Sequence, residues 1–120
     1  MQGHRQQIGR RGEEIAAAFL IARGFRVMAK NWRCPAGEVD LIVERAGEVR
    51  FVEVKTRSNL AFGYPEEAVT RAKQRHLRKA VEYWLRSSSF TPHHYQVDVI
   101  AITFSDPEKE PEIVWLEQVL

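Results

Sequence analysis

The spacing of apolar residues near the start of the chain predicts a helix and then a strand. From about Gln7 to Arg23 apolar residues recur at steps of three and four, which is typical of one helix face, and Gly24 follows where helices often end. Residues 25–30 then alternate between apolar and polar types, which predicts a strand. Residues 31–37 contain a proline and a glycine, so we expect a loop there.

The next apolar alternation predicts a hairpin. Two strands are expected at about 38–44 and 48–56, joined by a short turn at Ala46-Gly47. If the turn holds two residues, Arg45 lies opposite Glu48, and this pair sets the register of the whole hairpin.

The second half of the chain predicts a helix between two polar breaks and then a buried strand. After an expected loop at 59–65, residues 66–86 carry an apolar stripe at helical spacing. A nearly continuous apolar run at 95–104 is typical of a strand that is buried on both faces. A last short strand is expected at 113–116.

This order, α-β-β-β-α-β with a C-terminal addition, predicts an α/β fold with a mixed central sheet flanked by helices. The length of 120 residues fits one domain over residues 1–120, with a core at about 8–104 and an extension at 105–120. The hydrophobic share of 44% and the charged share of 28% are ordinary for a protein with a packed core.

The composition also indicates in which cellular compartment the protein is expected. No apolar run is long enough for a membrane span, and the polar, basic segment Met1–Arg11 lacks the apolar stretch of a signal peptide. The only cysteine, Cys34, has no partner for an internal disulfide, which favours a reducing compartment. We therefore expect a cytoplasmic protein without a membrane partner.

The candidate chemistry comes from the hairpin, where one face is apolar and the other is charged. Side chains of a strand alternate between the two faces of a sheet, so burying the apolar residues fixes where the charges go. The apolar set expected on one side is Val39, Leu41, Val43, Val52 and Val54. The charged set expected on the other side is Glu38, Asp40, Glu53 and Lys55, with Asp40 opposite Glu53 and Glu38 opposite Lys55.

Two carboxylates that face each other destabilise a sheet unless a cation lies between them. Lys55 is one candidate cation, and a divalent metal is the other, since Mg²⁺ is commonly held by one or two carboxylates, water and a substrate phosphate. Such a metal site supports phosphodiester hydrolysis. The alternative is a solvated surface, because charged pairs on hairpins usually lie in water. The spacing alone leaves both readings open.

Three stretches give the chain a resemblance to a known family. They are Gly12-Glu13-Glu14, Gly37-Glu38-Val39-Asp40-Leu41-Ile42 and Phe51-Val52-Glu53-Val54-Lys55-Thr56-Arg57. From about Ile8 to Phe104 the chain resembles the YraN family of small bacterial proteins. That family is similar in turn to archaeal Holliday-junction resolvases and to the restriction-endonuclease-like PD-(D/E)xK superfamily.

The resemblance implies a single restriction-endonuclease-like domain with an αβββαβ core. It implies that Asp40 and Glu53 bind Mg²⁺ or Mn²⁺ together with the Val54 carbonyl, and that Lys55 is the catalytic lysine. It also implies a further ligand, Glu14, on the first helix. Expected close neighbours of the site are Glu38, Thr56 and Arg57.

Basic residues outside the hairpin suggest a surface for nucleic acid, although the net charge of +2 does not indicate one by itself. Arg71, Arg75 and Arg78 share one face of the second helix. A charged helix face is most often only solvated, and phosphate binding is the other reading. The set expected to bind nucleic acid is Arg10, Arg11, Arg57, Arg71, Arg75 and Arg78.

Asp98 interrupts the apolar run of the late strand, and a buried charge needs a partner. A structural partner such as Arg57 and a role in the site explain it equally well. The chain has Gln96-Val97-Asp98 where the family pattern is Arg-Phe-Asp, so a phosphate contact by that arginine is absent.

The sequence thus predicts a metal-dependent endonuclease that hydrolyses DNA, with branched or junction structures as expected substrates. The resemblance to junction resolvases also favours a homodimer. A second hypothesis is a nucleic-acid-binding module that keeps the nuclease fold without turnover. A third is an adaptor whose charged hairpin is only a surface.

Overall fold

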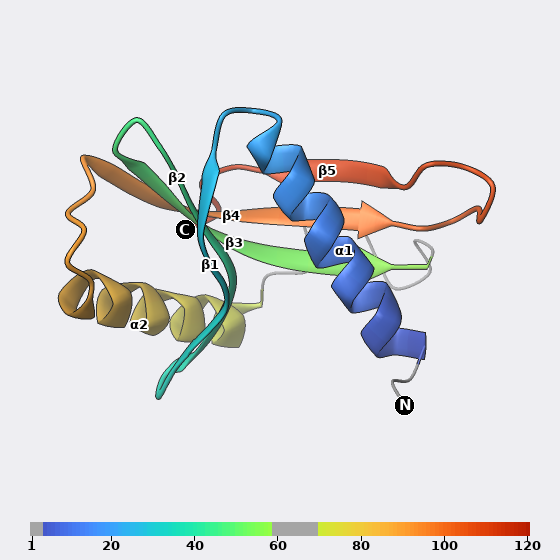
Figure 1. Cartoon of the computed structure of the whole chain (residues 1–120). Coiled ribbons are helices and arrows are strands. Elements are labelled where there is room, and N and C mark those ends of the chain that lie inside the picture. Colours follow the sequence, from blue (N-terminus) through green and yellow to red (C-terminus); the bar gives the residue numbers. More distant parts are fainter. Residues whose placement is uncertain (1–3, 59–69) are drawn as a thin grey trace.

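The computed structural model describes residues 4–58 and 70–120, which form one five-stranded sheet and two helices (Figure 1). The elements are α1 His4–Ile21, β1 Arg26–Cys34, β2 Gly37–Arg45, β3 Glu48–Arg57, α2 Arg71–Ser87, β4 His94–Thr103 and β5 Glu112–Leu116. The loop expected at 59–65 and the expected start of the second helix at 66 lie outside the described residues. The predicted order of helices and strands is confirmed.

The strands lie in the order β1-β2-β3-β4-β5. Neighbouring strands are antiparallel except β3 and β4, which are parallel because the chain between them crosses over through α2. The sheet is therefore mixed, as the sequence predicted. Neither described helix is long and apolar enough to cross a membrane.

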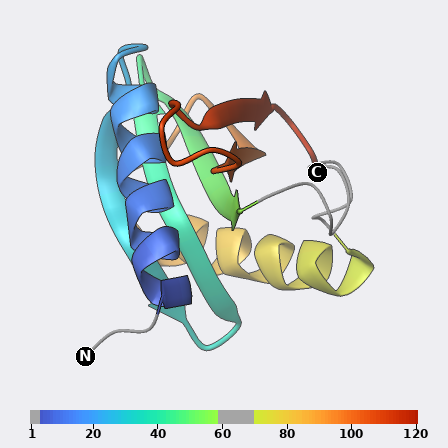
Figure 2. The same ribbon diagram turned by 90° about the vertical axis from the view of Figure 1, so that its right-hand side faces the viewer.

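The two helices cover opposite faces of the sheet and bury two separate cores (Figure 2). The core under α1 contains Ala16, Ala17, Leu20, Phe25, Leu41, Val43, Val52, Ile100 and Ile102. The core under α2 contains Val39, Ile42, Val49, Phe51, Leu77, Ala80, Val81, Trp84 and Val97. Alternation along β3 explains the division, since Phe51 and Val52 point to opposite faces.

The register predicted for the β2–β3 hairpin is confirmed. Arg45 pairs with Glu48, and the ladder runs on to Leu41 opposite Val52. Ala46 and Gly47 both have positive φ, 52° and 82°, as a two-residue turn that matches the twist of its strands requires.

The pairing between β2 and β3 then stops, although both strands continue. Beyond Leu41, β2 stays paired with β1 alone, and Glu38 lies opposite Arg33. The expectation that Glu38 faces Lys55 across the ladder is therefore wrong. The expected side for Val39 is also wrong, because this residue belongs to the core under α2. The two strands fork at Leu41, and regular alternation across the hairpin ends there.

The segment 31–37 was expected to be a loop, but most of it belongs to a long β1–β2 hairpin. β1 runs to Cys34, and Cys34 pairs directly with Gly37. Trp32 and Cys34 pack against the core under α2, and this burial keeps the strand extended up to the turn. The proline signal therefore marks only the tip of the hairpin.

A close approach of α1 to β3 fixes the distance between these elements. Gly12 is buried, and a Cβ atom on it would overlap the Cγ2 of Thr56 and lie 3.2 Å from its Cβ. Only glycine fits at this point of contact. Both residues belong to the stretches that carry the family resemblance.

Gly12→Ala is therefore expected to destabilise the protein by about 1–3 kcal/mol, the usual effect of overpacking. The double variant Gly12→Ala/Thr56→Ala should recover most of this loss, because it removes the overlapping methyl group. Urea denaturation of the two single variants and the double variant measures the recovery. Additive losses would show that the contact does not limit the approach of α1.

Candidate active site

Asp40 lies at the fork between β2 and β3. One of its carboxylate oxygens accepts a hydrogen bond of 2.8 Å from the Val54 backbone N–H. The side chain therefore takes the place of a backbone acceptor where the ladder has stopped. This bond fixes the carboxylate beside β3, one position past the last pair of the ladder.

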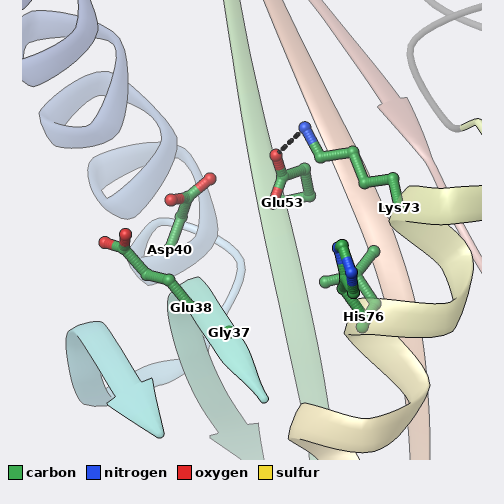
Figure 3. Close-up of a pocket in the computed structure, with 7 residues that line it drawn as sticks. Gly37, Glu38, Asp40, Glu53, Lys73 and His76 are labelled. Carbon is green, nitrogen blue, oxygen red and sulfur yellow. Dashed lines mark ion pairs between the residues drawn. The ribbon is translucent and has the colours of Figure 1, made fainter. Parts of the chain in front are cut away.

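Glu53 on β3 faces the same cavity as Asp40, so the predicted meeting of the two carboxylates is present (Figure 3). The cavity has a volume of about 250 Å³ and lies between the forked strands and α2. It is lined by Gly37, Glu38, Asp40, Glu53, Lys73, His76 and Leu77. Glu53 is buried, with 8% of its surface exposed.

The negative charges of Asp40 and Glu53 repel each other, and burial and this repulsion together raise the pKa of Asp40. Burial and then the charge of Glu53 raise the pKa of Asp40 to about 7, although the Val54 N–H opposes the rise. The charges of Glu13 and Glu38 raise the pKa of Asp40 further. A site that makes ionisation of an aspartate this unfavourable is one that a cation would stabilise.

Two lysines reach the carboxylates, one from the sheet and one from α2. Lys73 forms an ion pair with Glu53 (Figure 3). Lys55 lies beside Lys73, and the hydrogen bond to Lys73, burial and the charge of Lys73 lower the pKa of Lys55. Burial would also lower the pKa of Lys73, but hydrogen bonds to Glu53 and Lys55 outweigh it and raise this pKa. Lys73 therefore holds its proton more firmly than Lys55 does.

On α1 the carboxylate whose charge acts on Asp40 is Glu13, whereas Glu14 is exposed. Both glutamates line a pocket with Arg10 and Lys30 that is separate from the cavity of Asp40 and Glu53. When the Asn31 side chain is oriented for hydrogen bonding, its amide nitrogen donates to a Glu13 carboxylate oxygen at 3.2 Å. The family resemblance implied the neighbouring residue, Glu14, as the further metal ligand. The role of Glu14 as a metal ligand stays a prediction.

The donor set suits a hard divalent cation with few protein ligands. Within residues 4–58 and 70–120, no three His, Cys, Asp or Glu side chains come close enough together to hold a metal. Mg²⁺ commonly needs only one or two carboxylates, with water and phosphate in its other positions. Asp40 and Glu53 meet that requirement, while Lys73 competes for Glu53. The Val54 carbonyl as a ligand stays a prediction.

The predicted arginines lie on α1, α2 and the end of β3. Five of them are exposed: Arg10, Arg11, Arg71, Arg75 and Arg78. Arg57 is half-buried, and the Arg11 guanidinium also stacks 5.1 Å from the Phe104 ring. Their contact with nucleic acid stays a prediction.

Asp98 has no place in this cavity. It is fully buried, and its partner is Arg50, at 2.9 Å, rather than Arg57. Its carboxylate also accepts hydrogen bonds from the Trp115 indole at 3.0 Å and the Gln96 amide at 2.9 Å. The structural reading of Asp98 is therefore the one that the contacts support.

Sequence reasoning missed Lys73 and His76 as lining residues of the cavity. Lys73 lies four residues ahead of Leu77 and His76 lies four residues ahead of Ala80, so they extend the apolar stripe of α2 toward the N-terminus of the helix. That stripe faces the sheet, and polar residues at its end must face the sheet's polar edge. The signal was present in the helical spacing.

Comparison with known sequences finds the same domain in other bacteria. Residues 12–102 match the model of the uncharacterised protein family UPF0102. A UPF0102 protein of Clavibacter michiganensis subsp. michiganensis is 46% identical over 97 residues, which cover 81% of this chain and 82% of that protein. A UPF0102 protein of Nocardia farcinica is 41% identical over 117 residues, 98% of this chain and 91% of that protein.

Proposed function

We propose that this chain, which belongs to the uncharacterised protein family UPF0102 (the YraN family), is a metal-dependent endonuclease that hydrolyses DNA phosphodiester bonds. The observation that most supports this proposal is that Asp40 and Glu53 face one cavity, with two lysines beside them. The expected similarity of this family to junction resolvases makes branched DNA the first substrate to test.

In this proposal Asp40 and Glu53 hold Mg²⁺ or Mn²⁺, with the Val54 carbonyl as the expected third protein ligand. When bound, the ion polarises a phosphoryl oxygen and lowers the pKa of a water molecule. Asp40 must be ionised to bind a cation, and its pKa of about 7 means that the metal displaces a proton near neutral pH.

Lys55 has the property needed to take a proton from the attacking water. Its pKa is lowered by Lys73 and by burial, so its neutral amine forms more readily than that of an ordinary lysine. The water oxygen bonds to phosphorus, its proton passes to the Lys55 amine, and one P–O ester bond breaks. The departing oxygen takes a proton from solvent.

Binding of the DNA backbone is assigned to the exposed arginines of α1 and α2. Arginine side chains bind phosphates through charge-assisted hydrogen bonds and release counterions, so affinity should fall steeply as salt rises. These residues lie on the two helices that flank the sheet, on either side of the strands that carry the carboxylates (Figure 2).

One observation favours a second candidate, a nucleic-acid-binding module without turnover. Lys73 already supplies Glu53 with a positive charge. If that ion pair persisted in the presence of divalent ions, the site would hold DNA through its cations without cleaving it.

A cleavage screen tests the proposal. Purified protein is incubated with junction, flap, duplex and single-stranded DNA in Mn²⁺, with Lys55→Ala as the matched variant that excludes a contaminating nuclease. We expect cleavage by the wild type and a loss of about 100-fold or more in Lys55→Ala. Binding without cleavage on every substrate and ion would favour the second candidate, and equal cleavage by both proteins would refute the role of Lys55.

A further inference from the structure

Lys73 lines the cavity and is held there by the first turn of α2. Its backbone N–H donates to the Thr70 hydroxyl at 3.2 Å, and the Gln74 N–H donates to the Thr70 carbonyl at 2.9 Å. Thr70 is therefore the N-cap of the helix, and Lys73 is its third residue. The cap positions the Lys73 backbone beside the carboxylates, and the long side chain extends from there to its partner.

The side chain of Lys73 contacts two charged groups, the Glu53 carboxylate and the Lys55 ammonium. Its ammonium pairs with Glu53 and also contacts Lys55, the lysine two residues further along β3. The Lys73 side chain is 28% exposed, whereas that of Glu53 is 11% exposed. The Lys73 side chain is therefore more accessible than its carboxylate partner, both to solvent and to a ligand in the cavity.

We propose that Lys73 is an exchangeable counter-ion: it holds Glu53 while no divalent ion is bound, and it pairs with the substrate phosphate once the metal takes Glu53. This inference rests on the proposed function. It assigns one residue to both states of the site, which keeps the buried carboxylate paired throughout.

The exchange follows from the charges. A metal and Lys73 need the same carboxylate, so each weakens the binding of the other. A substrate phosphate brings a new negative charge into the cavity at the moment when Lys73 loses its first partner. The flexible four-carbon stem of lysine allows its ammonium to reach either group.

Isothermal titration with Mn²⁺ measures this competition directly, because it does not depend on cleavage. The proteins are wild type, Lys73→Met, Lys73→Arg and Asp40→Asn. The matched control is Lys79→Met, which removes the same charge from an exposed position of α2 about 240° around the helix. Lys73→Gln replaces Lys73→Met if the latter fails to fold.

We expect Lys73→Met to bind Mn²⁺ about tenfold more tightly than the wild type, which corresponds to about 1.4 kcal/mol. Lys73→Arg and Lys79→Met should bind it like the wild type, and Asp40→Asn should not bind it. In the cleavage assay Lys73→Met should be slower despite its tighter metal, and Lys73→Arg should recover part of the rate.

The outcomes separate this inference from the proposed function. Wild-type binding that Lys73→Met leaves unchanged or weakens would overturn the counter-ion role and leave the metal site standing. If neither the wild type nor any variant binds Mn²⁺, the metal site and the inference are both overturned. Tighter binding in Lys79→Met as well would show a general charge effect and would also overturn the inference.

Discussion

Asp40→Asn is expected to abolish metal-dependent cleavage while making the metal-free protein more stable above neutral pH. Removal of one group that organises charge in a transition state commonly costs about 100- to 1000-fold in rate. The asparagine side-chain oxygen can still accept the Val54 N–H bond, so the geometry of the fork is kept. The change removes only the charge that Glu53 and burial oppose.

The pH dependence of this stabilisation has a definite sign. The pKa of Asp40 is raised from 3.8 to about 7, so the folded protein binds more protons than the unfolded chain between these values. Stability contributed by this group therefore falls as pH rises through that window. The advantage of Asp40→Asn should be small near pH 4 and largest above pH 7.

Thermal unfolding of both proteins in chelator, over this pH range, provides the measurement. Glu53→Gln is expected to lose cleavage in Mn²⁺ in the same way, while its stability in chelator stays close to that of the wild type. Wild-type cleavage rates in Asp40→Asn would refute the assignment of the metal site. A destabilised Asp40→Asn at pH 8 would show that the aspartate is satisfied by a cation already present.

Asp98→Asn is expected to have the opposite effect, a large loss of stability. Asp98 is fully buried, and the Arg50 that pairs with it is 6% exposed. Breaking a buried ion pair by removing one partner costs about 3–5 kcal/mol, because the other charge stays buried. Burial keeps Arg50 from reaching water, although Glu48 and Glu117 also contact it, at 2.6 Å and 2.7 Å.

Urea denaturation measures this loss, and a double variant controls for it. Arg50→Met/Asp98→Leu removes both charges and should recover a large part of the stability, since apolar replacement of a whole buried pair is often neutral. A loss for Asp98→Asn below about 1 kcal/mol would place the pair in the class of weak, solvent-screened bridges.

The sequence predicted the element order and the register of the central hairpin because both follow from local periodicity. Period-two alternation and a two-residue turn leave one register that buries the apolar side chains, and Arg45 opposite Glu48 confirms it. Extending this register by one pair predicts that Asp40 meets Glu53, and both side chains line the same cavity although the ladder ends at Leu41.

The remaining features depend on contacts between distant segments. The fork at Leu41 arises where β2 continues with β1 alone, and alternation within the hairpin carries no signal of that choice. The sequence left Asp98 open between a structural partner such as Arg57 and a role in the site, and the structure pairs it with Arg50 because Arg50 lies on the same face of the sheet. Lys73 was overlooked because it lies among arginines that point to solvent.

The contact between Gly12 and Thr56 joins the arginine-bearing helix α1 to the strand that carries Glu53 and Lys55. α1 carries Arg10 and Arg11 immediately before Gly12, and β3 carries Lys55 immediately before Thr56. Because α1 and β3 are in direct contact here, the positions of these arginines are tied to the position of β3. If the chain is the proposed nuclease, this contact sets the distance between the phosphates bound by the arginines of α1 and the bond that is cut, and we then expect products of uniform length.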